Sequence, residues 1–174
     1  SRNFGDIRAM NSIDRRSFLR QSALATAALS IAPARGFSAE PAEKVKLGLI
    51  GCGWWGMIVV EAAFKAGGVE VVALCDVDSA PLEKAAAKVA SLQSQRPKTF
   101  KRHEDLLAVD GLQAVIIATP PHWHALQFID ALNRGLDIYC EKPLAYDIRE
   151  GQAMVTAAQK AGRIVQIGFQ RRQS

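Results

Sequence analysis

The 174-residue sequence is poor in cysteine and histidine, with three of each, and has only two tyrosines. The scattered Cys52, Cys75 and Cys140 are too few for a disulfide framework or a four-cysteine zinc site. The sequence also lacks an apolar run of about twenty residues, the length that a membrane-spanning helix requires. Hydrophobic residues make up 49% and charged residues 22%, a composition that excludes disorder and a collagen-like chain and indicates a globular protein with a sizeable core.

An excess of positive charge is confined to the N-terminal segment. The formal net charge is +5, but residues 1–39 contain six Arg and two Asp, whereas residues 40–174 contain 16 basic and 15 acidic residues. A nucleic-acid-binding protein carries its Lys and Arg clusters on the folded domain. The charge distribution therefore argues against DNA or RNA as a partner.

The excess accompanies a pattern typical of protein export. Residues Asp14–Arg20 contain the pair Arg15-Arg16 and precede a mildly apolar, Ala- and Ser-rich run over Ala23–Ala34. This segment resembles a twin-arginine (Tat) export signal, and the run is too short to span a membrane. An amphipathic helix with a chance arginine pair is the alternative. We expect residues 1–39 to be a leader that is removed or stays outside the fold, and the protein to be exported to the periplasm.

Beyond Pro41, short β-branched runs alternate with longer stretches of helical period. Continuous apolar runs are typical of strands buried on both faces, and the intervening segments have the length of helices. This alternation predicts right-handed crossovers and a doubly wound parallel α/β sheet in residues 40–170. The predicted strands are 45–50, 69–75, 98–100, 112–118, 136–140 and 164–168, and the predicted helices are 55–66, 80–92, 122–134 and 147–161.

The first predicted strand runs directly into a glycine-rich segment, Gly51-Cys52-Gly53-Trp54-Trp55-Gly56, that opens the first helix. This is the context of a dinucleotide-binding turn. Gly51 permits the tight turn, Gly53 lets the backbone approach a pyrophosphate, and Gly56 allows close packing of helix on strand. Because a helix N-terminus presents free N–H groups to an anion, the amides of Trp54 and Trp55 are candidate pyrophosphate ligands.

An acidic residue follows the second strand. Asp76 lies 20 positions after Gly56, where a carboxylate can accept hydrogen bonds from the adenosine ribose of NAD and would repel the 2′-phosphate of NADP. Asp78 adds negative charge nearby. Together with the glycine turn, Asp76 predicts a Rossmann domain that binds NAD in preference to NADP. A glycine turn with an unrelated surface aspartate is the alternative.

The strand ending at Ala118 leads into Thr119 and Pro120. In open α/β sheets the ligand lies beyond the carboxyl ends of the strands, so we expect these two residues to border the cofactor. His124 is expected to cap or pack at the start of the next helix, with its ring near the cofactor, and it is a candidate for a direct contact. His122 and His124 form an H-x-H pair, but no third ligand stands at a suitable spacing, and we predict no metal site.

Glu141 and Lys142 follow the next long strand and reach the same edge of the sheet. Glu141 is a candidate cofactor contact. A lysine ammonium beside a nicotinamide could hydrogen-bond a substrate hydroxyl and help its proton to leave, so Lys142 is the candidate catalytic residue. A solvent-facing ion pair between the two is the alternative.

The set of motifs resembles the Gfo/Idh/MocA oxidoreductases over residues 44–170. The resemblance implies a catalytic role for Lys142, a cis bond into Pro143 in many members, and a second domain that holds the substrate and the remaining catalytic Asp and His. That domain commonly forms the homo-oligomer, and we expect residues 171–174 to begin the connector to it. The motifs are, in chain order, Gly51 to Gly56, Asp76, Ala118-Thr119-Pro120, His124 and Glu141-Lys142-Pro143.

The sequence thus predicts the cofactor-binding part of an exported NAD-dependent oxidoreductase that acts on a sugar, polyol or glycoside carbinol, and that binds cofactor without turnover on its own. One alternative is an NAD-dependent glycoside hydrolase of the same superfamily, which oxidises its sugar only transiently. Another is a non-catalytic NAD-binding module. Gln170-Arg171-Arg172 fits either a contact with cofactor or an anionic sugar substituent, or a solvated linker.

Overall fold

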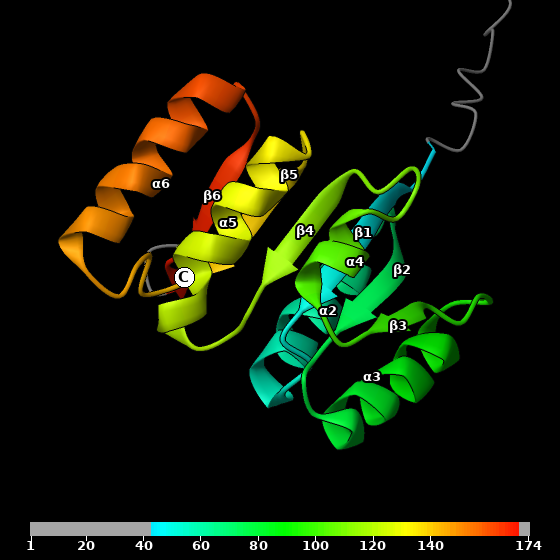
Figure 1. The fold of residues 1–174 in the computed structure, drawn as a ribbon. Coiled ribbons are helices and arrows are strands. Elements are labelled where there is room, and N and C mark those ends of the chain that lie inside the picture. The colour runs from blue at the N-terminus through cyan, green and yellow to red at the C-terminus, as the bar shows by residue number, and fades with distance from the viewer. Residues whose placement is uncertain (1–42, 171–174) are drawn as a thin grey trace, which may run out of the picture. The chain divides into compact units, whose positions relative to one another are not determined.

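A computed structural model describes residues 43–170 (Figure 1). The predicted leader, residues 1–39, and the predicted connector, residues 171–174, lie outside the described residues. The helices are α2 (Trp54–Ala66), α3 (Ser79–Leu92), α4 (His103–Leu107), the 3-10 helix η1 (Pro121–Trp123), α5 (His124–Asn133) and α6 (Ile148–Ala161). The strands are β1 (Val45–Ile50), β2 (Val69–Cys75), β3 (Lys98–Phe100), β4 (Ala114–Ile117), β5 (Asp137–Glu141) and β6 (Val165–Gly168).

The described strands form one six-stranded sheet in the order β3-β2-β1-β4-β5-β6, and every pairing is parallel. This arrangement confirms the predicted doubly wound parallel sheet. The strand order reverses between β1 and β4, which pair directly. In open α/β sheets such a reversal opens a crevice at the carboxyl ends of the two strands, and ligands bind there.

Two hydrophobic clusters hold helices onto the two faces of the sheet. Successive strand side chains point to opposite faces, and β1 accordingly sends Leu49 into one cluster and Ile50 into the other. The first cluster joins β1 and β2 to α2 and α3 through buried residues such as Val60 and Val89. The second joins β4 and β5 to α4, α5 and α6. Because both faces are covered near β1, the glycine turn that follows it rests on a rigid base.

Two helical segments differ from the sequence prediction. The segment predicted as one helix over 122–134 is the short 3-10 helix η1 followed by α5. Pro121 has no N–H to donate inside a helix, and it occupies the first position of η1, where none is needed. Helix α4 was not predicted, since its five residues are too few to show a helical period.

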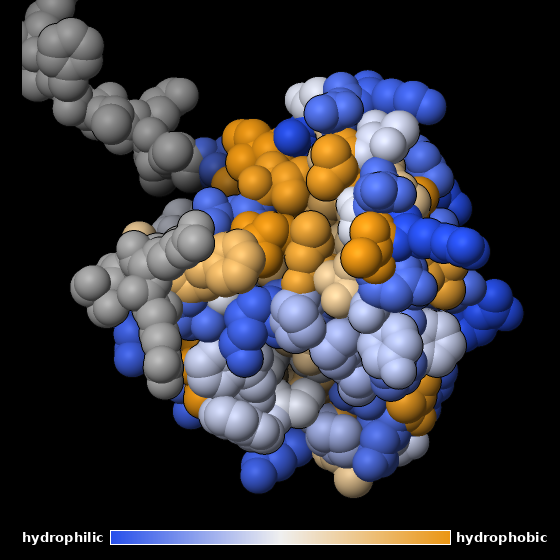
Figure 2. Space-filling model, turned by 90° about the vertical axis from the view of Figure 1, so that its left-hand side faces the viewer, coloured by the Kyte–Doolittle hydropathy of each residue, from blue (hydrophilic) through white to orange (hydrophobic). Residues whose placement is uncertain are grey.

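Hydrophobic side chains gather on the face shown in Figure 2, which is the side of the molecule where α6 lies in Figure 1. Ile148 and Val155 of α6 are exposed and line a shallow depression with Leu144. Within residues 43–170 no helix is long and apolar enough to cross a membrane.

Candidate cofactor-binding site

The glycine turn is held by two contacts that only glycine permits. Gly51 has a φ of 95°, and a Cβ there would lie 2.7 Å from the backbone of Ala118. A Cβ on Gly56 would overlap the carbonyl oxygen of Gly51, so α2 packs directly on the turn. Gly53 differs from both, because it has ordinary extended geometry and no atom lies within 4 Å of its Cβ position. The chain thus leaves open space above the start of α2.

The N-terminus of α2 faces that open space without a side-chain cap. Gly53 is the N-cap residue, and no acidic residue stands in the first turn. The first N–H groups of a helix have no acceptor within the helix and carry a partial positive charge. Trp54 is 75% exposed and packs edge-on against Trp55, with ring centroids 5.2 Å apart. This end of α2 is therefore suited to an anion.

Asp76 shapes the glycine turn as well as facing the crevice. Its Oδ2 accepts a hydrogen bond from the N–H of Cys52 at 2.8 Å, and its Oδ1 accepts one from the N–H of Asp78 at 2.9 Å. The carboxylate therefore links the turn after β1 to the turn after β2. The sequence argument placed Asp76 correctly at the strand end but did not reveal this bond, because it depends on the pairing of β1 with β2.

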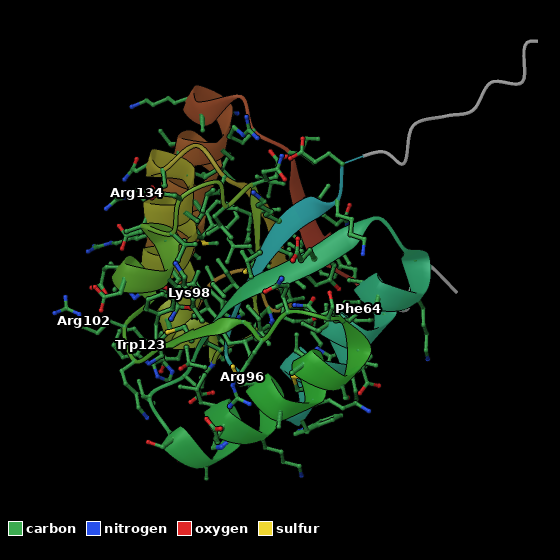
Figure 3. All side chains as sticks on the ribbon, turned by 90° about the vertical axis from the view of Figure 1, so that its right-hand side faces the viewer. Phe64, Arg96, Lys98, Arg102, Trp123 and Arg134 are labelled. Atoms are coloured by element: carbon green, nitrogen blue, oxygen red, sulfur yellow. The ribbon has the colours of Figure 1, made fainter. Side chains whose placement is uncertain are left out.

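A pocket of about 480 Å³ opens beside Asp76 and is lined by Gly53, Val77, Thr119, Pro120 and Trp123 among others. Lys101 and Arg102 also line it. The ammonium of Lys101 donates to the carbonyl of Val77 at 3.0 Å and to the hydroxyl of Ser79 at 2.6 Å. Arg102, labelled with Trp123 in Figure 3, pairs with Glu104 at 3.2 Å. That hydrogen bond raises the pKa of Arg102 and lowers the pKa of Glu104.

His103 also lines this pocket. It is 8% exposed, and its Nε2 lies 2.8 Å from Oδ2 of Asp130 on α5. The ring thus ties the short helix α4 to α5. Sequence reasoning did not single out His103, Lys101, Arg102 or Trp123, since only the position of β3 and α4 beside β2 brings them to the crevice.

A second pocket, of about 580 Å³, lies on the other side of Thr119 and Pro120. It is lined by Trp54, Trp55, Glu141 and Lys142 among others, and it shares Gly53, Ala118, Thr119 and Pro120 with the first pocket. The two pockets therefore form one groove across the carboxyl end of the sheet. The groove brings together these residues predicted from the sequence: Gly51, Gly53, Trp54, Trp55, Gly56, Asp76, Thr119, Pro120, Glu141 and Lys142.

Glu141 and Lys142 do not form an ion pair. Glu141 is 3% exposed and accepts hydrogen bonds from Gln170 Nε2 at 2.8 and 3.0 Å, from the Tyr139 hydroxyl at 3.2 Å and from the N–H of Lys142 at 3.2 Å. Burial, and then the negative charge of Glu141, raise the pKa of Tyr139. Lys142 is exposed, and its ammonium has no partner among the residues that the structure describes. The peptide bond from Lys142 to Pro143 is cis, as the resemblance implied.

His124 lines neither pocket but contacts the two loops that carry Thr119 and Pro143. Only 1% of it is exposed, and its two ring nitrogens lie 2.8 Å from the carbonyl oxygens of Thr119 and Pro143. The hydroxyl of Thr119 also donates to Gln127 one turn later on α5, at 2.7 Å. Helix α5 begins at His124, and the side chain packs between the loops that follow β4 and β5. A contact of the ring with the cofactor stays a prediction.

The three cysteines are buried free thiols. Burial first, and then the negative charge of Asp76 beside Cys52 and Cys75 and of Glu141 beside Cys140, raise the pKa of each of the three thiols to about 12. They remain protonated near neutral pH, which makes them poor nucleophiles and poor metal ligands. Within the described range, His, Cys, Asp and Glu form no group of three or more that could hold a metal ion.

The chain is similar to curated proteins of bacterial origin. It is 31% identical over 174 residues to a "Glycosyl hydrolase family 109 protein" of Shewanella sp. (strain W3-18-1), an alignment that covers 87% of this chain and 38% of that protein. It is 37% identical over 143 residues to a protein of the same name from Stenotrophomonas maltophilia (strain K279a), covering 76% of this chain and 30% of the relative. The chain thus spans less than two fifths of the length of these relatives.

The chain is also similar to solved structures of dehydrogenases. The myo-inositol 2-dehydrogenase of Lactobacillus plantarum matches with a TM-score of 0.68 and 30% identity, covering 75% of this chain and 38% of the dehydrogenase. The WlbA dehydrogenase of Chromobacterium violaceum, solved with NADH and UDP-GlcNAcA, matches with the same TM-score and identity, covering 75% of this chain and 36% of WlbA. The model of the Gfo/Idh/MocA oxidoreductase family, NAD-binding Rossmann fold, matches residues 45–169. The chain therefore belongs to the Gfo/Idh/MocA oxidoreductase family and contains its NAD-binding Rossmann fold.

Proposed function

We propose that this chain is the cofactor-binding part of an NAD-dependent oxidoreductase that transfers hydride between nicotinamide and a carbinol carbon of a sugar, polyol or glycoside. The observation that carries the proposal is the continuous groove from Asp76, across Gly53, to Lys142. It combines a carboxylate, an uncapped helix N-terminus and an ammonium that has no partner within residues 43–170, along one edge of the sheet. A dinucleotide needs these three features in this order, for its ribose, its pyrophosphate and the reacting end.

The residues at the centre of the groove suit a pyrophosphate. The space beside Gly53 would be filled by any larger side chain, and the first turn of α2 offers N–H groups without side-chain acceptors. Asp76 accepts one hydrogen bond at each oxygen, and a carboxylate has about four acceptor positions in all. It can therefore hold the turn and still accept from ribose hydroxyls.

We propose NAD rather than NADP for the same pocket. Two cations, Lys101 and Arg102, line this pocket. The ammonium of Lys101 is hydrogen-bonded to Val77 and Ser79. The guanidinium of Arg102 is paired with Glu104. The carboxylate of Asp76 would repel a 2′-phosphate, and neither cation is free to compensate for it. The preference for NAD thus depends on these pairings as well as on Asp76.

At the other end of the groove we propose a catalytic role for Lys142. A bound nicotinamide would supply the hydride acceptor or donor. The ammonium of Lys142, which has no partner in the described part of the chain, can hydrogen-bond a substrate hydroxyl, stabilise negative charge on its oxygen and assist departure of its proton. Glu141 holds the backbone N–H of Lys142, and Gln170 and Tyr139 fix Glu141 in turn.

A second candidate function is glycoside hydrolysis with a recycled NAD, favoured by the names of the curated relatives. The two candidates share this cofactor site and differ in their products. In a longer protein that contains this chain, a dehydrogenase would accumulate NADH when substrate is added. A hydrolase would release the aglycone without a net change in NADH.

We also propose that residues 1–39 direct Tat-dependent export, on the basis of Arg15-Arg16 and the apolar run that follows. Residues 1–43 fused to a reporter that is active only in the periplasm should be exported, and replacing both arginines by lysine should abolish export. Export of the lysine variant through another route would contradict the Tat assignment.

The cofactor proposal is tested by calorimetric titration of the whole chain with NAD and with NADP. We expect tighter binding of NAD, and a reduced preference for it in Asp76→Asn, which keeps the size and one acceptor oxygen of the side chain. Asp147→Asn is the matched control, because Asp147 lines neither pocket, caps α6 through the N–H of Glu150, and asparagine caps equally well. Equal effects of both variants, or no binding of either nucleotide by the wild-type chain, would contradict the proposal.

A further inference from the structure

Glu141 is a buried carboxylate whose acceptor positions are taken by its neighbours. It is 3% exposed. Its Oε1 accepts from the Tyr139 hydroxyl at 3.2 Å, and its Oε2 accepts from the N–H of Lys142 at 3.2 Å. The Nε2 of Gln170 lies 2.8 Å from Oε1 and 3.0 Å from Oε2. Because a carboxylate has about four acceptor positions, Glu141 has little capacity left for a ligand.

These contacts fix the orientation of the Gln170 side-chain amide. Its nitrogen must face Glu141, since a reversed amide would set its own oxygen against two oxygens that only accept. The Oε1 of Gln170 accepts no hydrogen bond from residues 43–170. Among those residues, every buried side-chain nitrogen or oxygen has a partner, so this oxygen is accessible rather than sealed inside the protein. Gln170 lines the second pocket beside Lys142, which therefore has an oriented hydrogen-bond acceptor in its wall.

We propose that the Oε1 of Gln170 binds the carboxamide NH2 of the nicotinamide and thereby orients the reacting ring beside Lys142. The inference rests on the proposed function, in which this end of the groove holds the nicotinamide. A carboxamide offers two N–H donors, and an acceptor fixed at its side sets the rotation of the ring about its bond to ribose. That rotation decides which face of the ring is turned toward Lys142, and orientation of this kind is a large part of catalysis.

The cluster that holds Gln170 is closely packed. Gly168, the last residue of β6, is the register partner of Glu141. A Cβ on Gly168 would lie 2.5 Å from the hydroxyl oxygen of Tyr139, 2.7 Å from Oε1 of Glu141 and 3.0 Å from Nε2 of Gln170. Hydrogen bonds to a charged group are stronger than those between neutral groups. The Gln170 amide is thus held in place before a ligand binds, and its ordering costs the complex little entropy.

The experiment compares calorimetric titrations with NAD and with 3-acetylpyridine adenine dinucleotide, in which a methyl group replaces the NH2 of the carboxamide. Loss of one hydrogen bond between neutral groups predicts that the wild-type chain binds NAD about three- to tenfold more tightly than the analogue. Gln170→Met keeps the length of the side chain without its amide and should bind the two ligands equally, within about twofold.

Gln166→Met is the matched control. Gln166 is a glutamine of β6 that lines neither pocket, and its Nε2 donates to the carbonyl of Ile167 at 2.8 Å. This variant should keep the wild-type preference for NAD. ADP lacks the nicotinamide half and should bind the wild-type chain and both variants equally, within about twofold. Parallel loss of NAD and ADP affinity in Gln170→Met, or a preference for NAD that survives in that variant, would overturn the proposal.

The wild-type chain gives two further readouts that do not depend on the folding of a variant. Equal affinity for NAD and the analogue would overturn the proposal. In NMR spectra, NAD should shift the side-chain NH2 resonances of Gln170 and ADP should leave them in place, and unchanged resonances at saturating NAD would also overturn it. Binding of neither NAD nor ADP would contradict the proposed function itself, and this proposal with it. Binding of ADP without discrimination between NAD and the analogue would overturn this proposal alone.

Discussion

Gly53 and Gly56 stand three residues apart in the same turn, and the structure predicts opposite consequences for the same substitution. At Gly53 the backbone has φ −63° and ψ 177°, which alanine adopts without strain, and nothing lies within 4 Å of the new Cβ. Gly53→Ala should therefore change the free energy of unfolding by no more than about 0.5 kcal/mol. At Gly56 the new Cβ would overlap the carbonyl oxygen of Gly51, so α2 must move away from the turn.

The magnitudes follow from these two environments. Overpacking of a tight contact costs about 1 to 3 kcal/mol, which corresponds to a loss of roughly 4 to 12 °C in Tm for a domain of this size. Gly56→Ala should show that loss. Gly53→Ala should keep the wild-type Tm but block the close approach of a phosphate to the backbone. Hydrogen bonds to charged groups contribute about 1.5 to 3 kcal/mol, so NADH affinity should fall by about ten- to a hundredfold.

Circular dichroism gives the Tm of each variant, and calorimetric titration with NADH gives its affinity. Asp147→Asn is again a suitable control for handling and stability. If Gly53→Ala binds NADH as tightly as the wild-type chain, the open space above α2 is not the phosphate site. If Gly53→Ala unfolds as readily as Gly56→Ala, the reading of the turn geometry is wrong.

Three further predictions concern stability and burial. Cys52, Cys75 and Cys140 have pKa values raised from 9.0 to about 12 by burial; because the unfolded chain loses these protons first, Tm should be unaffected by them below pH 9 and fall as the pH rises from 9 toward 12. A thiol reagent at pH 8 should leave all three unmodified until the protein is denatured, and rapid labelling of the native chain would contradict their burial. Asp147→Ala removes the N-cap of α6, which accepts from the N–H of Glu150 at 2.8 Å, and should cost about 1 kcal/mol in urea unfolding. NADH affinity should be unchanged in this variant, since neither Asp147 nor Glu150 lines the groove.

Much of the fold is predictable from local patterns. The bounds of β1, β2 and β3 match the prediction, because each strand stands between clear turn signals. The predicted strand over 112–118 is longer than β4, Ala114–Ile117. Gly111 has a φ of 75°, and the N–H of Leu112 bonds back to Val109, so the chain is still in a turn where the apolar run begins. The apolar character of a residue alone does not show whether it lies in a turn or in a strand.

The candidate site was predictable in its location but not in its bonding. Parallel strands bring their carboxyl ends to one edge, so the glycine turn, Asp76, Thr119 and Lys142 could be placed together from the strand pattern. The burial of Glu141 could not be predicted, because it depends on a hydrogen bond from Gln170. Gln170 lies 29 residues later in the chain, after α6 and β6. The placement of His124 depends likewise on Pro143, which only the pairing of β4 with β5 brings near.

The central claim is that one groove, from Asp76 to Lys142, binds the dinucleotide along its length. The most direct measurement is a titration of the isotope-labelled chain with NADH, followed through its backbone amide resonances, with ADP as the shorter ligand. The account predicts that NADH shifts the amides of Gly53, Val77, Thr119 and Lys142, and that ADP shifts the first three but not Lys142. Shifts that leave Gly53 and Lys142 unaffected, or that fall mainly on α6, would contradict it.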